Sequence, residues 1–231
     1  MYFSSDKLYK LSKEALRGRK QEEVYERLIH WVNLRYKINA IYVDFNIESN
    51  GKQSKLHLIL KDQSDYQKML DNSGYNSIIQ DEIAGKFREI LREEDSDIDT
   101  KIIAEKVFKF FRKPKTNIWV CYSNFINVYS AEISTELTKN EIKTLVEKYK
   151  VGNIWEIHTN GFYITVFFEK ESHIEENKEN LFFENLKREY FEIVKQKDEF
   201  GFFKKDKIIL LFDSKENFDK NFESNWYYYY K

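Results

Sequence analysis

The spacing of apolar residues along the chain alternates between the period of a helix and the period of a strand. Residues 13–37 place apolar side chains three and four positions apart, which is typical of an amphipathic helix. Residues 41–48 then alternate apolar and polar side chains, which is typical of a strand buried on one face. The first half is therefore predicted to contain a helix at 13–37, strands at 41–48 and 55–61, helices at 77–94 and 99–112, and a strand at 117–122.

The first two strands are predicted to form a hairpin, because Asn50-Gly51 between them is a strong signal for a two-residue turn. With these residues in the turn, apolar side chains face each other in three pairs: Phe45 with Leu56, Val43 with Leu58, and Ile41 with Leu60. The same register places Asp44 opposite His57 on the polar face. A slip of one residue would lose all of these matches, so the pattern supports the register.

The second half is predicted to repeat this order of elements. Its pattern predicts a strand at 125–133, a helix at 138–150, strands at 153–159 and 162–169 around Asn160-Gly161, a helix at 177–198, a strand at 207–212, and a short helix at 214–222 capped by Ser214. The order strand, helix, strand, strand, helix, strand (βαββαβ) is typical of ferredoxin-like domains.

We therefore predict an α+β protein of two ferredoxin-like halves, residues 1–123 and 124–231. Each half has an Asn-Gly hairpin and an antiparallel sheet with its helices on one face. The first half carries an extra helix and lacks a clear first strand, so the similarity of the halves is one of pattern.

The composition is that of a globular protein without a strong preference for a charged partner. Hydrophobic residues make up 42% of the chain, and 38 basic side chains nearly balance 39 acidic ones. The single cysteine, Cys121, lies in an apolar run, which favours a core position in a reducing compartment. The sequence shows neither a signal-peptide core nor an apolar run of membrane-spanning length, so we expect a soluble, cytoplasmic protein.

The two hairpins carry the side chains that are the best candidates for acid–base chemistry. Asp44 and His57 are close enough to pair across the first hairpin, where the carboxylate would raise the basicity of the imidazole. The simpler interpretation is a cross-strand ion pair that faces solvent. On the second hairpin, reactive residue types share one face: Glu156, His158, Tyr163 and Thr165. The other face is predicted to be apolar: Trp155, Ile157, Ile164 and Val166. Because Ile154 and Phe167 share the reactive face, we expect both faces to be covered.

No metal or cofactor motif is complete. Asp95, Asp97 and Asp99 resemble the start of a calcium loop, but Thr100 and Lys106 stand where such a loop has glycine and glutamate. The histidines and the cysteine lack zinc spacing, and no phosphate-binding glycine loop occurs in the sequence. We expect neither a metal nor a cofactor, and the sequence identifies no catalytic residue.

Three classes of function remain open. The first is a non-catalytic protein-binding domain, such as an immunity or inhibitor-type protein, because clustered tyrosine and tryptophan are typical of interface anchors. Its predicted contact residues are Tyr42, Asp44, His57, Trp226, Tyr228 and Tyr230.

The second is an RNA-binding protein or a metal-independent endoribonuclease, because cations alternate with phenylalanines in one segment. Its predicted contact residues are Lys106, Lys109, Arg112, Lys113 and Lys115. The third is a small-molecule sensor.

The chain ends in Trp226 and four consecutive tyrosines. Aromatic residues favour strands, and the first half lacks a first strand. We therefore predict that residues 226–230 pair with the free edge of the first sheet and only secondarily present their outer tyrosines to a partner; residues 1–5 are the alternative segment for the same edge.

Overall fold

The computed structural model describes residues 6–47, 53–95, 117–137, 139–178 and 181–231. The chain divides into two compact units, residues 1–127 and 128–231. The division falls within helix α6 (Phe125–Thr135). The predicted helix at 99–112 lies outside the described residues, as do the Asn50-Gly51 turn and the calcium-like segment from Asp97 onward.

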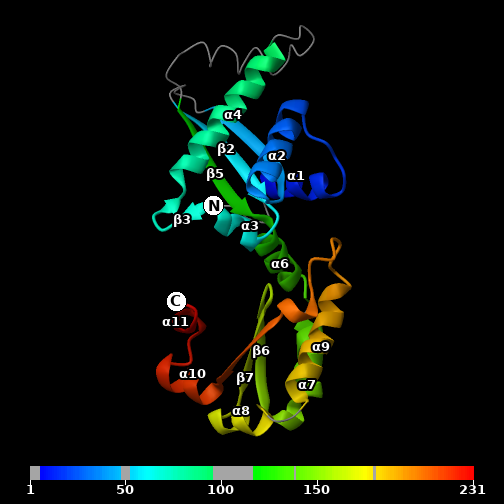
Figure 1. The fold of residues 1–231 in the computed structure, drawn as a ribbon. Coiled ribbons are helices and arrows are strands. Elements are labelled where there is room, and N and C mark those ends of the chain that lie inside the picture. The colour runs from blue at the N-terminus through cyan, green and yellow to red at the C-terminus, as the bar shows by residue number, and fades with distance from the viewer. Residues whose placement is uncertain (1–5, 48–52, 96–116, 138, 179–180) are drawn as a thin grey trace. The chain divides into compact units, whose positions relative to one another are not determined.

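The first unit is built around a hairpin with helices before and after it (Figure 1). Its elements are α1 (Lys7–Leu16), α2 (Glu23–Tyr36), β1 (Ala40–Ile47), β2 (Gln53–Leu60), α3 (Gln63–Lys68), the short strands β3 (Leu70–Asp71) and β4 (Gly74–Tyr75), α4 (Ser77–Asp95) and β5 (Asn117–Asn124). The predicted helix at 13–37 is thus two helices. It breaks after Arg17 because Gly18 adopts a φ of +95°, which a continuing helix does not allow.

The main sheet of the first unit has the strand order β1-β2-β5. β1 and β2 are antiparallel, but β2 and β5 are parallel, so the prediction of an antiparallel sheet is wrong. The physical reason is the length of the chain between β2 and β5, which includes α3 and α4, because parallel neighbours require a long connection and a short hairpin cannot join them.

The register of the first hairpin agrees with two of the three predicted apolar pairs. Phe45 lies opposite Leu56, and Val43 lies opposite Leu58. At the third position the prediction is wrong, because an irregularity between Ala40 and Tyr42 sets Ala40, not Ile41, opposite Leu60.

The core of the first unit lies between this sheet and the helices α2 and α4. Leu56, Leu58 and Leu60 of β2 are fully buried there. From α2 and α4, the buried side chains are Val24, Leu28, Val32, Ile83, Ala84, Phe87 and Ile90. α1 begins on the opposite face of the sheet, where its Tyr9 stacks on Phe125 at 5.2 Å. The prediction that all helices cover one face is therefore wrong for α1.

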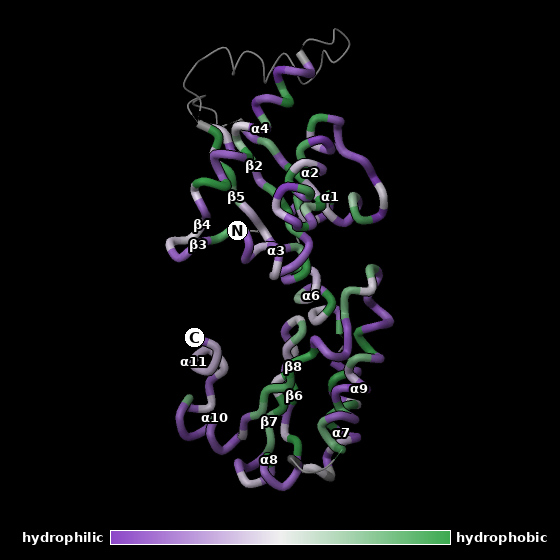
Figure 2. Tube along the Cα trace, in the orientation of Figure 1, coloured by the Kyte–Doolittle hydropathy of each residue, from purple (hydrophilic) through white to green (hydrophobic). Residues whose placement is uncertain are grey.

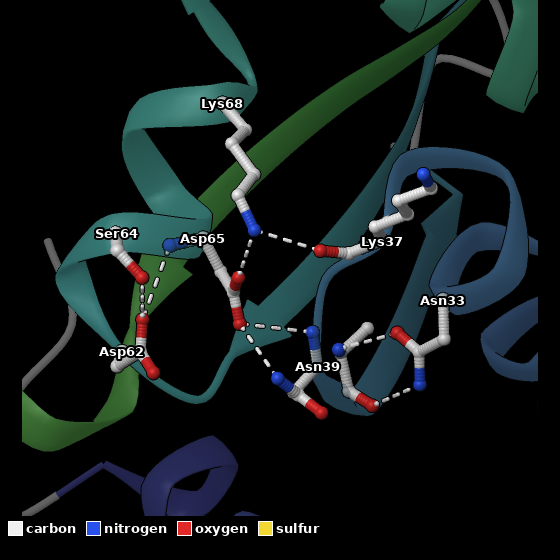
Figure 3. A network of polar contacts seen from close by, with 8 residues as sticks. Asn33, Lys37, Asn39, Asp62, Ser64, Asp65 and Lys68 are labelled. Atoms are coloured by element: carbon white, nitrogen blue, oxygen red, sulfur yellow. Dashed lines mark hydrogen bonds and ion pairs between the residues drawn. The ribbon is translucent and has the colours of Figure 1, made fainter.

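A buried carboxylate fixes the entry to β1 (Figure 3). Asp65 is 2% exposed and accepts hydrogen bonds from the Asn39 backbone N at 2.9 Å, from Asn39 Nδ2 at 3.1 Å and from Lys68 Nζ at 2.9 Å. Asn33 of α2 accepts from the Ala40 backbone N at 2.6 Å and donates to the Ala40 carbonyl at 3.1 Å. These bonds hold α2, α3 and the start of β1 together.

The second unit has a similar arrangement of a hairpin, helices and a third strand. Its elements after α6 are α7 (Lys139–Lys148), β6 (Ile154–Asn160), β7 (Tyr163–Phe168), α8 (Glu171–Lys178), α9 (Phe182–Lys195), β8 (Ile209–Ser214), α10 (Lys215–Asn221) and α11 (Trp226–Tyr229), with 3₁₀ turns at Lys150–Gly152 and Lys205–Lys207. The sheet order is β6-β7-β8, with β6 and β7 antiparallel and β7 and β8 parallel. Apolar residues concentrate on these strands (Figure 2).

The strand predicted at 125–133 is wrong, because this segment is α6. Its buried residues Phe125, Tyr129 and Ile133 are four positions apart, so the short apolar run satisfies the helical period as well as alternation. The described part of the second unit therefore has a three-stranded sheet in place of the four strands of βαββαβ. The helix predicted at 177–198 is also divided, into α8 and α9.

The second hairpin turns at Gly161-Phe162, because Asn160 still pairs with Tyr163. Gly161 has a φ of +62°, and a Cβ there would lie 2.6 Å from Ser130 Oγ, so both the turn and the packing require glycine. Ser214 caps α10 as predicted, since its Oγ accepts from the Asn217 backbone N at 3.0 Å.

Candidate functional sites

Two regions of the described residues combine exposed surface with reactive or aromatic side chains. The first, here called the sheet-1 pocket, is a hollow of about 350 Å³ on the face of the first sheet that α2 and α4 do not cover. Each strand contributes alternate residues to it, because successive side chains of a strand point to opposite faces. The pocket is lined by Asp44 and Asn46 of β1, Lys55 and His57 of β2, Trp119, Cys121 and Ser123 of β5, with Tyr75, Tyr122, Asp6 and Leu8 at its border.

His57 lies at the centre of the polar groups of this pocket, between Asp44 of β1 and Ser123 of β5. Its Nε2 lies 2.7 Å from Ser123 Oγ. Burial, with a smaller contribution from the positive charge of Lys55, lowers the pKa of His57 to about 4. The imidazole is therefore neutral at pH 7. Asp44 does lie opposite His57 as predicted, but the expected rise in the basicity of the imidazole is wrong, because burial lowers the pKa of His57.

The other titratable groups of the sheet-1 pocket are also shaped by burial. Burial raises the pKa of the Asp44 carboxyl, whereas the amide of Asn46 and the charges of Lys7 and Lys55 lower it. Burial raises the pKa of Cys121 to about 11, so this residue is a neutral thiol and a poor nucleophile at pH 7. Among the strand residues of the described lining, the pocket thus offers the carboxylate of Asp44 beside the neutral groups of His57 and Cys121.

Trp119 forms a flat wall of the sheet-1 pocket. It is 42% exposed, and Lys55 Nζ lies 5.5 Å from its ring centroid. A partly exposed indole with a cation on its face is a surface on which a planar ligand can stack.

The second region is the face of the second sheet on which the C-terminal residues pack. The tail prediction is wrong in its secondary structure and its location, because residues 226–229 form α11 and contact the second sheet. Asn225 caps this helix by accepting a hydrogen bond from the Tyr227 backbone N at 2.9 Å. Trp226 is the anchor: its ring lies 4.0 Å from that of Phe218 and 4.1 Å from that of His158.

The bulge in β6 brings a further ring into this packing. An irregularity between Ile154 and Glu156 turns Trp155 away from the apolar face predicted for it. Trp155 instead stacks on Trp226 at 5.7 Å and contacts Phe167 at 6.1 Å. Ile157, Ile164 and Val166 are buried as predicted on the other face, so both faces of this hairpin carry covering residues.

A chain of three polar groups runs through the same region. His158 Nε2 lies 3.1 Å from Glu156 Oε1, and His158 Nδ1 lies 2.6 Å from the Tyr230 hydroxyl. Burial, with the charges of Glu156 and Asp213, raises the pKa of Tyr230 to about 12, so the phenol stays protonated at pH 7. Next to it, the Tyr229 hydroxyl donates to Asp213 Oδ2 at 2.6 Å. These bonds hold α11 in one orientation on the sheet.

Large apolar side chains remain exposed around α11. They form the exposed apolar patch, which we define as Tyr163, Ile209, Leu211, Tyr227, Tyr228 and Tyr230, each between 43% and 67% exposed.

The structure brings together some of the predicted contact residues and separates others. Asp44 and His57 share the sheet-1 pocket, whereas Tyr42 pairs with Ile59 and is half-buried. Trp226 is a packing anchor, whereas Tyr228 and Tyr230 are exposed. The basic residues from Lys106 to Lys115 lie outside the described part of the chain. The pattern missed Ser123, although the alternation of Trp119 and Cys121 continues to it along β5.

Searches for a matching protein family, for similar curated proteins and for similar solved structures found no match. Within the residues described, no helix is both long and apolar enough to cross a membrane. The same residues contain no group of three or more histidine, cysteine or acidic side chains placed to hold a metal ion.

Proposed function

We propose that this chain is a non-catalytic protein-binding domain, of the kind that neutralises or assembles with another protein. The observation that carries the proposal is the exposed apolar patch. Contiguous exposed apolar surface is typical of interaction sites, and tyrosine is enriched among the residues that dominate binding energy.

The strand register supports the continuity of this patch. Tyr163 pairs with Ile209, and Thr165 pairs with Leu211, so the three apolar side chains occupy neighbouring rows on one face of the sheet. Thr165 also pairs with His158, which contacts the Tyr230 hydroxyl. The sheet residues and the tyrosines of α11 therefore adjoin each other within the second unit.

The packing and hydrogen bonds that hold α11 in place also favour binding of a partner protein. Trp226 packs on Phe218, and the hydroxyl of Tyr229 is bonded to Asp213. A partner that contacts Tyr228 or Tyr230 would then order fewer residues on binding, and the entropic cost of association would be lower.

A matched pair of variants tests the proposal. Ile209→Lys places a charge within the patch, whereas Ile78→Lys places the same charge at a 77% exposed isoleucine of the first unit. A protein captured from the native host by the wild type and by Ile78→Lys, but not by Ile209→Lys, supports the proposal. Equal capture by both variants contradicts it, provided that circular dichroism shows both to be folded.

A further inference from the structure

We propose that the sheet-1 pocket binds a nucleobase that carries an exocyclic amino group, as adenine and cytosine do. This inference concerns the first unit and does not depend on the protein-binding role proposed for the second. It rests on the shape of the pocket, on its hydrogen-bonding groups and on its charge balance.

The shape favours a planar ligand. The volume of about 350 Å³ lies within the range of about 300–1,000 Å³ that small-ligand pockets occupy. Trp119 contributes a partly exposed ring, and Lys55 already lies over its face. Stacking of a base on this indole would use the face of the sheet, because Trp119 points to the same side as the other strand residues that line the pocket.

The hydrogen-bonding groups favour an amino-bearing edge. Asp44 Oδ2 accepts a bond from Asn46 Nδ2, and within the described residues Oδ1 accepts none. A carboxylate oxygen accepts bonds but cannot donate them, so it selects an amino group over a carbonyl at the same position of a ring. Asn46 and the neutral His57–Ser123 pair add groups that both donate and accept, as the remaining edge of a base requires.

The charge balance favours the base over its phosphate. Among the described residues that line the pocket, Asp6 and Asp44 are acidic and Lys55 is basic, so this lining has no excess of cations for a phosphate group. The same base chemistry is presented by a free nucleoside and by single-stranded nucleic acid, and these two sources are separated in the experiment below.

The test is a calorimetric titration of the full chain with cytidine and uridine, which differ in an amino group and a carbonyl at one ring position. We expect cytidine to bind about tenfold more tightly than uridine, because a hydrogen bond to a charged group is at stake. Asp44→Asn should reduce this preference to about twofold or less, since an amide both donates and accepts. Trp119→Ala should weaken cytidine binding about tenfold, while Trp119→Phe retains most of it. Leu181→Ala, at a 77% exposed residue of the second unit, is the control and should bind cytidine as the wild type does.

Titrations with short oligonucleotides of cytosine and of uracil then identify the source. Binding of the cytosine oligonucleotide at least tenfold tighter than cytidine assigns the pocket to a base in a single strand, and equal binding assigns it to a free nucleoside. Both results support base recognition. The proposal is overturned if neither cytidine nor the cytosine oligonucleotide binds, if both bind Trp119→Ala as well as the wild type, or if Asp44→Asn leaves the preference over uridine unchanged.

Discussion

Replacement of Trp226 by alanine tests whether the C-terminal residues are part of the fold of the second unit. Trp226 is half-buried and lies against Phe218, His158 and Phe167 at ring distances of 4.0, 4.1 and 5.0 Å. A tryptophan buries roughly 200 Å² when enclosed, so about half of this area is removed from water here. At about 25 cal/mol per Å² this burial contributes about 2.5 kcal/mol. The stack on Phe218 adds about 0.5–1.5 kcal/mol.

We therefore expect Trp226→Ala to lower the free energy of unfolding of the second unit by about 3 kcal/mol. With a urea m-value of about 1–3 kcal/mol per M, the midpoint should fall by roughly 1–3 M. The assay is urea denaturation followed by circular dichroism, fitted with separate transitions for the two units. Tyr227→Ala is the control, because this tyrosine is 67% exposed and should change the free energy by less than about 0.5 kcal/mol. A Trp226→Ala midpoint equal to that of the control would refute the docking of α11.

Three further predictions concern other parts of the described structure. Ser214→Ala removes the cap of α10 and should cost about 1 kcal/mol in urea denaturation, whereas Ser214→Asp should retain most of that stability; equal loss in both variants would argue against a capping role. Asp65→Ala leaves the Asn39 backbone N without its acceptor and removes one of the two acceptors of Lys68 Nζ, so the first unit should lose about 3 kcal/mol, and a loss below about 1 kcal/mol would contradict the role of this buried carboxylate. Because the folded pKa of His57 is about 4 against an ordinary value of 6.5, the unfolded chain binds more protons between these values, and stability falls as the pH falls through this window. The loss is on the order of 3 kcal/mol by pH 4, and the measurement is the pH dependence of urea denaturation. His57→Gln should remove this component, and an unchanged slope in the variant would show that His57 is not the group responsible.

The sequence pattern predicts the parts of the fold in which one local signal dominates. The alternation of Val43 and Phe45 against Leu56 and Leu58 specifies the register of the first hairpin, because a slip would expose these four residues. The apolar stripe of α4 and the cap at Ser214 are specified by equally local signals.

The sequence pattern mispredicts secondary structure where two periods fit the same residues. It also fails where contacts with residues distant in the sequence determine the conformation of a segment. The run Phe125–Ile133 satisfies both strand and helix spacing, and the helix α6 buries Phe125, Tyr129 and Ile133 together. The tail has strand propensity, but Trp226 gains more by stacking on Trp155 and Phe218 than by pairing with a sheet edge. Nothing local to residues 226–230 identifies those two partners.

In the candidate sites, too, some features follow from local sequence and others depend on distant contacts. The opposition of Asp44 and His57 follows from the hairpin register, but their environment does not, because the burial that keeps His57 neutral comes from the full sheet. The position of Ser123 next to His57 depends on the parallel pairing of β2 and β5, which a count of residues along the chain does not reveal.

Hydrogen–deuterium exchange on a complex with the captured partner tests the central claim most directly. The partner should slow exchange in β7, β8 and α11, the elements that carry the exposed apolar patch, and leave α2 and α4 unchanged. Protection confined to other elements, with β8 and α11 exchanging as in the free chain, would contradict the proposal that this surface binds the partner.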